Sequence, residues 1–158
     1  MNLFIDKHQN LVSVLLKHNV DFLLIGGYAV IHHGYKRTTG DMDIWLKPHN
    51  DNKPKIIKVL KEVGVMRESI EVVETFDFTK HLVFSIWSDP EKVDFITRIN
   101  LVEFEEANEQ KIMADIDGLT IPIIHINHLV LSKFNTGRPQ DAADIDKLQK
   151  IQELRKNL

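Results

Sequence analysis

The sequence predicts an α/β fold of the α+β kind, in which one mixed β-sheet is covered by helices. Helical and strand patterns alternate over the first part of the chain, and strand patterns with an Asp-Gly turn follow before two C-terminal helices. Alternating elements followed by a hairpin are typical of a mixed sheet with helices packed against it. The 158 residues, 43% of them hydrophobic, fit a single domain over residues 1–158 with a sizeable core.

The individual elements follow from hydrophobic periodicity and from the turn residues between them. The first part predicts a helix over about residues 5–18, a strand over 22–25, a helix over 28–33, a strand over 42–47 and a helix over 52–63. Two more strands, HLVFSIW and KVDFIT, flank Ser88-Asp89-Pro90. Asp117-Gly118 predicts a hairpin turn, and the last two helices are expected to begin near Asn127 and Pro139.

A double glycine after the first strand forms the first candidate site. The apolar residues 22–25 run into Gly26 and Gly27, and residues 28–33 can form a helix of about two turns. Free N–H groups at a helix start attract anions, and glycine allows a ligand to approach closely. The pattern predicts a phosphate-binding turn, while an ordinary strand-to-helix turn is the alternative.

Asp41 and Asp43 open the next predicted strand. Side chains in a strand repeat every two residues, so both carboxylates are expected on one face. The same Asp-x-Asp spacing occurs again at residues 115/117 and 144/146. The first of these pairs belongs to a hairpin turn, and the second lies in a helix, where residues two apart do not face each other. Only Asp41 and Asp43 therefore have the geometry to bind one ion together.

A third acid, Asp94, stands inside the apolar strand KVDFIT. An ionised carboxylate in such a strand is costly unless it is paired, coordinated or solvated. Lys92 or Arg98 could pair with it, and metal coordination is the alternative. If Asp94 lies near Asp41 and Asp43, divalent cations would relieve the repulsion among the three carboxylates, and oxygen ligands favour Mg²⁺ or Mn²⁺.

Together these pieces resemble the DNA polymerase beta-like nucleotidyltransferase superfamily. The resemblance rests on Ile25-Gly26-Gly27, Asp41-Met42-Asp43-Ile44 and Val93-Asp94-Phe95, in that order. The stretch GGYAVIHHGYKRTTGDMDIWL is most similar to small nucleotidyltransferases related to the abortive-infection (AbiEii-like) toxin group. Arg37-Thr38-Thr39 matches an Arg-x-Thr element of that group.

The downstream part of the chain carries the resemblance further. Residues Lys133, Arg138, Asp141 and Asp144 match a lysine followed by an arginine-and-aspartate helix motif, whereas Gln140 stands where a lysine commonly precedes the first aspartate. The resemblance implies that Lys133 contacts nucleotide phosphates and that the other three matching residues brace two helices through ion pairs. A solvated lysine at a helix end is the alternative for Lys133.

The resemblance implies a nucleotidyltransferase fold and a metal-dependent transfer of a nucleoside monophosphate from a nucleoside triphosphate, such as ATP, to an acceptor hydroxyl. Asp41, Asp43 and Asp94 would be the catalytic residues and the ligands of Mg²⁺ or Mn²⁺. The triphosphate would be bound by Gly26, Gly27, Arg37, Thr39 and Lys133. A protein, an RNA and a small molecule all remain open as acceptors. The alternative is a non-catalytic nucleotide-binding or regulatory protein, paired with a partner protein in a toxin–antitoxin-like system.

Composition bounds the function without deciding it. The net charge of -3 gives no electrostatic footprint for bulk nucleic-acid binding. The sequence has no cysteine, which excludes a disulfide framework and cysteine-ligated zinc. The N-terminal segment MNLFIDKHQN lacks the apolar core of a signal peptide, and no stretch is long and apolar enough for a membrane span. The expected location is the cytoplasm, with no membrane partner.

Overall fold

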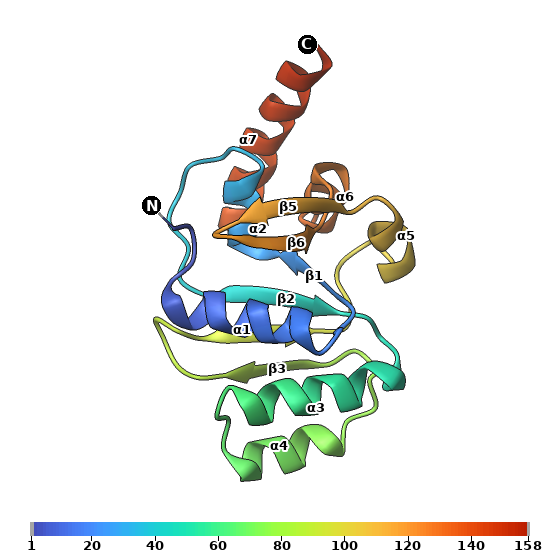
Figure 1. The fold of residues 1–158 in the computed structure, drawn as a ribbon. Coiled ribbons are helices and arrows are strands. Elements are labelled where there is room, and N and C mark those ends of the chain that lie inside the picture. The colour runs from blue at the N-terminus through green and yellow to red at the C-terminus, as the bar shows by residue number, and fades with distance from the viewer. Residues whose placement is uncertain (1, 158) are drawn as a thin grey trace.

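The computed structural model describes residues 2–157, which form a six-stranded sheet with helices around it (Figure 1). The strands are β1 (Phe22–Ile25), β2 (Met42–Leu46), β3 (Val83–Ile86), β4 (Val93–Ile96), β5 (Ile112–Ile116) and β6 (Leu119–Ile123). The helices are α1 (Asp6–Lys17), α2 (Gly26–His32), α3 (Lys53–Glu62), α4 (Arg67–Glu74), α5 (Phe104–Glu109), α6 (Ile126–Ser132) and α7 (Pro139–Lys156), with a 3-10 turn η1 (Asn50–Asn52).

The sheet is mixed, as the sequence predicts. Its strand order is β3-β4-β2-β1-β6-β5, so β3 and β5 form the two edges. Strands β2 and β4 run parallel, as do β1 and β6, whereas the β1–β2, β3–β4 and β5–β6 pairs are antiparallel. The parallel β2–β4 pair matters most for function, because it brings two segments together that are about fifty residues apart.

Alternation along the central strands separates the core from the polar face of the sheet. Leu24 pairs with Ile44, Ile44 with Phe95, and Phe95 with Phe84, which gives one continuous apolar row across four strands. The rings of Phe84 and Phe95 stack with centroids 5.1 Å apart. Because successive side chains point to opposite faces, the acids next to Ile44 and Phe95 in the sequence point away from this row.

The prediction that the second helix begins at residue 28 was wrong by two residues. Gly26 adopts a φ of +67°, which turns the chain directly from β1 into α2. The predicted strand HLVFSIW was too long at both ends, and at its C-terminal end Trp87 adopts a φ of 59°. Sequence periodicity also missed α4, α5 and η1. Each of these elements has eight residues or fewer, which is too short for a reliable helical repeat.

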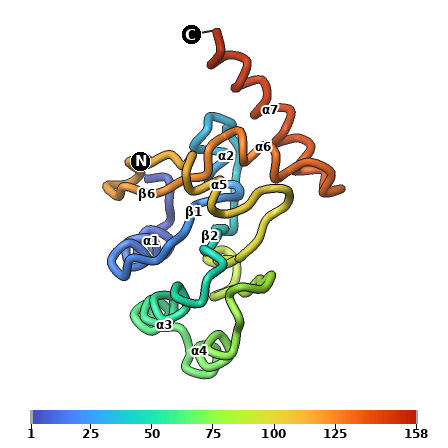
Figure 2. The backbone as a smooth tube through the Cα atoms, turned by 90° about the vertical axis from the view of Figure 1, so that its right-hand side faces the viewer, coloured from blue at the N-terminus to red at the C-terminus, as the bar shows by residue number. Residues whose placement is uncertain are grey.

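Helix α7 projects from the rest of the chain, at the end opposite α3 and α4 (Figures 1 and 2). Its buried residues Asp141, Asp144 and Leu148 all lie in its first ten residues, whereas Leu154 near its end is 68% exposed. The first turns of α7 therefore belong to the body of the protein. No helix within residues 2–157 is long and apolar enough to cross a membrane.

Candidate active site

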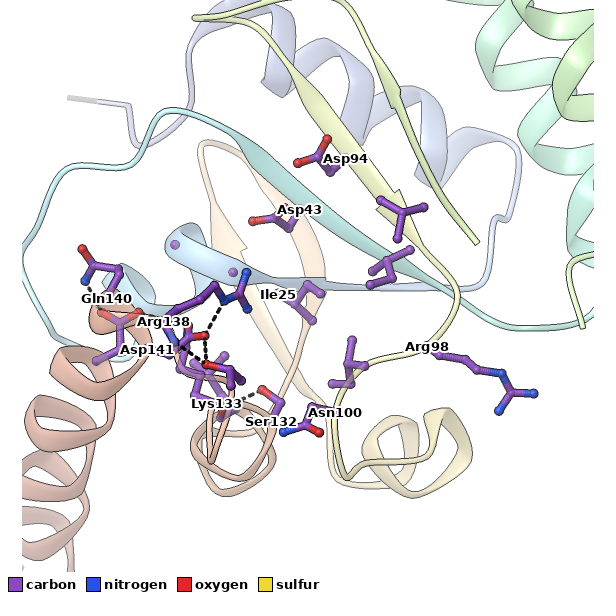
Figure 3. A pocket seen from close by; sticks show the side chains of 18 of the residues that line it. Ile25, Asp43, Asp94, Arg98, Asn100, Ser132, Lys133, Arg138, Gln140 and Asp141 are labelled. Atoms are coloured by element: carbon purple, nitrogen blue, oxygen red, sulfur yellow. Dashed lines mark hydrogen bonds and ion pairs between the residues drawn. The ribbon is translucent and has the colours of Figure 1, made fainter. Parts of the chain in front are cut away.

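A cavity of about 820 Å³ is bordered by β1–β4, the loop after β4, and helices α2, α6 and α7 (Figure 3). Six of the residues predicted from the sequence line it, namely Gly26, Gly27, Arg37, Asp43, Asp94 and Lys133. Asp41 and Thr39 do not line the cavity and lie beside it. In Figure 3, Asp43 and Asp94 stand on the sheet. Across the cavity lie Lys133 and Arg138, in the segment between α6 and α7, and Asp141 on α7.

Asp43 and Asp94 are direct neighbours on parallel strands. Their Cα atoms are partners in the β2–β4 register, where adjacent strands lie about 4.8 Å apart. Burial, and then the nearby charges of Asp94 and Asp41, raise the pKa of Asp43 from its ordinary 3.8 to about 6. Asp94 accepts a hydrogen bond from the hydroxyl of Ser85 on β3. For Asp43, residues 2–157 provide neither a hydrogen bond nor an ion pair to its side chain.

Gly26 and Gly27 make room for side chains of the chain itself. A Cβ atom at Gly26 would overlap with the carboxylate of Asp43, and one at Gly27 would overlap with the hydroxyl of Thr39. Thr39 in turn donates a hydrogen bond of 3.3 Å to the carbonyl oxygen of Asp41. The double glycine therefore lets β2 and the segment before it pack against the start of α2.

Asp41 lies just before β2, on the flank of the two cavity acids. Its pKa is raised, chiefly by a hydrogen bond with Asp89 and then by burial. Lys92 lies 3.9 Å from an oxygen of Asp41 and 3.6 Å from an oxygen of Asp94, so Lys92 is the one of the two candidate cations, Lys92 and Arg98, that pairs with Asp94. In the described part of the chain, no three His, Cys, Asp or Glu side chains form a group that could hold a metal ion by themselves. The structure thus brings Asp43 and Asp94 together and leaves Asp41 beside Lys92.

The opposite wall of the cavity is a network of ion pairs centred on Asp144, which is fully buried. Its two oxygens lie 3.1 Å from Nε and 3.2 Å from Nη2 of Arg37, and 3.0 Å from Nζ of Lys133. The amide of Gln140 donates a further hydrogen bond of 2.9 Å. Two cations of the cavity wall are therefore held by one carboxylate.

Asp141 extends this network along α7. It pairs with Lys133 at 3.2 Å and with Arg138 at 2.7 Å, and it accepts a hydrogen bond from Thr136. Burial opposes ionisation, but the Thr136 hydroxyl and the Lys133 charge outweigh it and lower the pKa of Asp141. Lys133, which directly follows α6, joins that helix to Asp141 and Asp144 on α7, whereas Arg138 pairs with Asp141 at the start of the same helix. The two helices are thus joined through the lysine that was expected to contact phosphates, and not through Arg138. The solvated alternative for Lys133 was wrong, since its side chain is only 10% exposed.

The far end of the cavity lies on the uncovered face of β3 and β4. Val83 and Ile96 are paired there, one row beyond Asp94 and Ser85, and Val83 is 60% exposed. Arg98 stands at this end, opposite Gln140 (Figure 3). Sequence analysis missed this surface and the contact of Ser85 with Asp94, because both depend on the register between β3 and β4. A polar residue within an apolar strand, as in HLVFSIW, is the one signal that marks Ser85.

Residues 4–157 match the family described as "Nucleotidyltransferase of unknown function (DUF6036)". The lincomycin-bound lincosamide antibiotic adenylyltransferase LnuA is similar in structure, with a TM-score of 0.56 and 18% identity over 96% of this chain and 99% of that one. ANT(2″)-Ia in complex with adenylyl-2″-tobramycin gives a TM-score of 0.56 and 13% identity over 95% and 93%. At these identities the likeness concerns the fold. No curated protein matched the sequence.

Proposed function

Because this chain belongs to the nucleotidyltransferase family DUF6036, we propose that it transfers a nucleoside monophosphate from a nucleoside triphosphate to an acceptor hydroxyl and releases pyrophosphate. The observation that carries this proposal is the in-register pair Asp43 and Asp94 on one wall of a cavity whose other wall holds Arg37 and Lys133. Acids that can bind a cation and cations that can bind phosphate then face the same space.

The carboxylates fit a divalent metal ion by their chemistry. Mg²⁺ and Mn²⁺ prefer oxygen ligands, and Mg²⁺ is commonly held by one or two carboxylates together with substrate phosphates. Asp43 has no cationic partner within residues 2–157, and its raised pKa records how poorly the protein alone accommodates its charge. Asp43 and Asp94 would hold the ion, with Asp41 at their side. A bound ion would stabilise the negative charge that develops on the phosphoryl oxygens.

The ion-pair network would hold the triphosphate end of the nucleotide. Asp144 fixes Arg37 and Lys133 on the cavity wall, so their orientation is set before a ligand arrives. Such preorganised cations favour a phosphate chain without a large entropy loss on binding. Gly26, Gly27 and Thr39 contribute by fixing the position of Asp43 and of the segment before β2.

The direction of attack assigns the acceptor to the other end of the cavity. In phosphoryl transfer the attacking oxygen approaches opposite the leaving group, roughly in line with it. With the pyrophosphate at Arg37 and Lys133, the acceptor hydroxyl enters over β3 and β4. A bond forms from its oxygen to the α-phosphorus as the bond to pyrophosphate breaks, and its proton passes to Asp94 or to water. Val83 and Ile96 would form the floor under the acceptor.

The acceptor class is the part to be found by experiment. Two solved proteins of this fold carry lincomycin and adenylylated tobramycin, so small hydroxyl compounds are the first acceptors to test. The residues around Arg37 and Lys133 resemble the toxin group, so RNA and protein hydroxyls are the next acceptors to test. In that case a partner protein would control the reaction.

The decisive experiment is to incubate the purified protein with each labelled nucleoside triphosphate, Mg²⁺ or Mn²⁺, and each acceptor pool in turn. We expect label on one pool, pyrophosphate release, and loss of both in Asp43→Asn. Binding of the nucleotide without transfer to any pool would instead identify a non-catalytic nucleotide-binding protein.

A further inference from the structure

Lys92 lies between two of the three acids of the site. Its ammonium group is 3.6 Å from Asp94 and 3.9 Å from Asp41, and its side chain is 36% exposed. The backbone holds it in place, because its carbonyl oxygen accepts a hydrogen bond of 3.2 Å from the N–H of Met42, the residue after Asp41. This hydrogen bond therefore holds Lys92 beside the start of β2, next to Asp41, and Lys92 also comes just before Asp94 in the sequence.

No other lysine or arginine within residues 2–157 forms an ion pair with these acids. Lys7, which is close in the fold, pairs with Glu91 at 3.5 Å and lies 4.4 Å over the ring of Trp87. Arg37 and Lys133 across the cavity are held by Asp144. Within residues 2–157, Lys92 is thus the one cation that forms ion pairs with the acids of the site.

We propose that Lys92 is a positioning residue that acts as the counter-ion of Asp94 and Asp41 in the nucleotide-free protein and competes with the divalent metal ion for them. This inference rests on the proposed function, since it concerns the same metal ligands. Asp41, Asp43 and Asp94, together with the Asp89 carboxylate bonded to Asp41, carry more negative charge than the one ammonium group offsets, so a divalent ion is attracted to them. An additional ion has to displace the ammonium group from Asp94 or bring its own anion.

The consequence is an order of binding. The free protein holds metal weakly, because the ammonium group repels the ion and occupies an oxygen of Asp94. A nucleoside triphosphate brings further negative charge together with its own metal ion, so the complete set of cations assembles with the nucleotide. Once displaced from Asp94, the ammonium group still has Asp41 as a partner.

The test is a titration of the nucleotide-free protein with Mn²⁺, in which free Mn²⁺ is followed by electron paramagnetic resonance. Lys92→Met removes the charge and offers no oxygen to the metal, and we expect it to bind Mn²⁺ about tenfold more tightly, equivalent to about 1.4 kcal/mol. Lys92→Arg keeps the charge and should bind as the wild type does. Lys7→Gln makes the same change in net charge outside the acids and should stay within about twofold of the wild type.

The outcomes separate this inference from the proposed function. Equal Mn²⁺ affinity in wild type and Lys92→Met, with labelled transfer intact in the wild type, overturns the role of Lys92 alone. Tighter binding in Lys7→Gln to the same extent also overturns it, because net charge would then explain the effect. If neither the wild type nor Lys92→Met binds Mn²⁺, the inference is overturned. If labelled transfer is absent as well, the proposed function is also overturned.

Discussion

Asp43 and Asp144 are both largely buried carboxylates on walls of the same cavity, yet the protein treats them in opposite ways. Asp144 is completely buried and is contacted by Arg37, Lys133 and Gln140. Asp43 has no such partner in the described residues, and its pKa is raised to about 6. A buried charge without a partner destabilises the folded chain, so the difference supports the proposal that Asp144 serves the fold and Asp43 binds a ligand.

The two regions also differ in where their partners come from. Asp144 and Arg37 are 107 positions apart in the sequence, so their pairing closes the chain over the cavity. Asp43 and Asp94 are joined only by strand pairing, and two like charges side by side repel each other. A metal ion would attract both carboxylates and offset their repulsion, whereas the charge of Asp144 is already balanced by side chains of the protein. Substitutions that remove the charge of Asp43 or of Asp144, or that move Asp43, test the comparison directly.

The largest effect is expected for Asp43→Asn on transfer. The substitution keeps the shape of the side chain and removes the charge that would bind the metal ion. We expect the rate of labelled transfer to fall by about a thousandfold or more, equivalent to about 4 kcal/mol, while circular dichroism stays unchanged. Transfer at the wild-type rate in this variant would remove Asp43 from the mechanism.

The next effect is a loss of stability in Asp144→Asn. Removing one partner of a buried ion pair leaves the other charges uncompensated, which typically costs about 3 kcal/mol. Asp146→Asn is the matched control, because Asp146 is two residues further along α7 and forms an exposed pair with Lys150, worth less than about 1 kcal/mol. Chemical denaturation of both variants measures the difference. Equal losses would show that the buried network contributes no more than a surface pair.

The pH dependence of stability gives a third, smaller effect with a defined sign. The pKa of Asp43 is higher in the folded protein, about 6, than its ordinary 3.8. The folded state therefore binds the proton more tightly, and this contribution to stability is lost as pH rises from about 4 to about 6. Without metal at pH 7, Asp43→Asn should be more stable than the wild type by up to about 3 kcal/mol, and the gain should fade toward pH 4.

Thermal melts of the metal-free wild type and of Asp43→Asn across this range measure that difference. A difference in stability that is the same at pH 4 and pH 7 would contradict a raised pKa at Asp43. Addition of Mn²⁺ at pH 7 should stabilise the wild type and leave the variant nearly unchanged, because only the carboxylate gains from the ion.

The contrast between the two regions also shows what the sequence could predict. Asp43 and Asp94 stand out as charges next to apolar strand residues, so local pattern and the family resemblance pointed to both. The pattern also excluded Asp144 and Asp146 as a chelating pair, because they are two apart on a helix. It could not predict that Asp144 is fully buried, since its partners Arg37 and Lys133 are brought to it only by the folded chain.

Strand register also limited what the sequence could predict about the cavity wall that carries Asp43 and Asp94. The β2–β4 pairing makes Asp43 and Asp94 neighbours, and the β3–β4 pairing gives Asp94 the hydroxyl of Ser85. Neither pairing is encoded in a single segment, because register depends on the whole sheet and on the turns that join its strands. The expectation for Asp41 was drawn from spacing and from the family resemblance, and the structure places this residue outside the cavity, beside Lys92.

The smallest effect separates backbone strain from the placement of Asp43. Gly26 and Gly64 have φ values of +67° and +82°, so alanine at either position should cost about 1 kcal/mol of stability. A Cβ atom meets nothing within 4 Å at Gly64, but at Gly26 it overlaps with the side chain of Asp43. Asp43 then has to turn away from Asp94, so Gly26→Ala should weaken Mn²⁺ binding by about fivefold, roughly 1 kcal/mol, whereas Gly64→Ala should not. Equal Mn²⁺ affinities in the two variants would mean that Gly26 serves the turn into α2 and has no part in holding Asp43 beside Asp94.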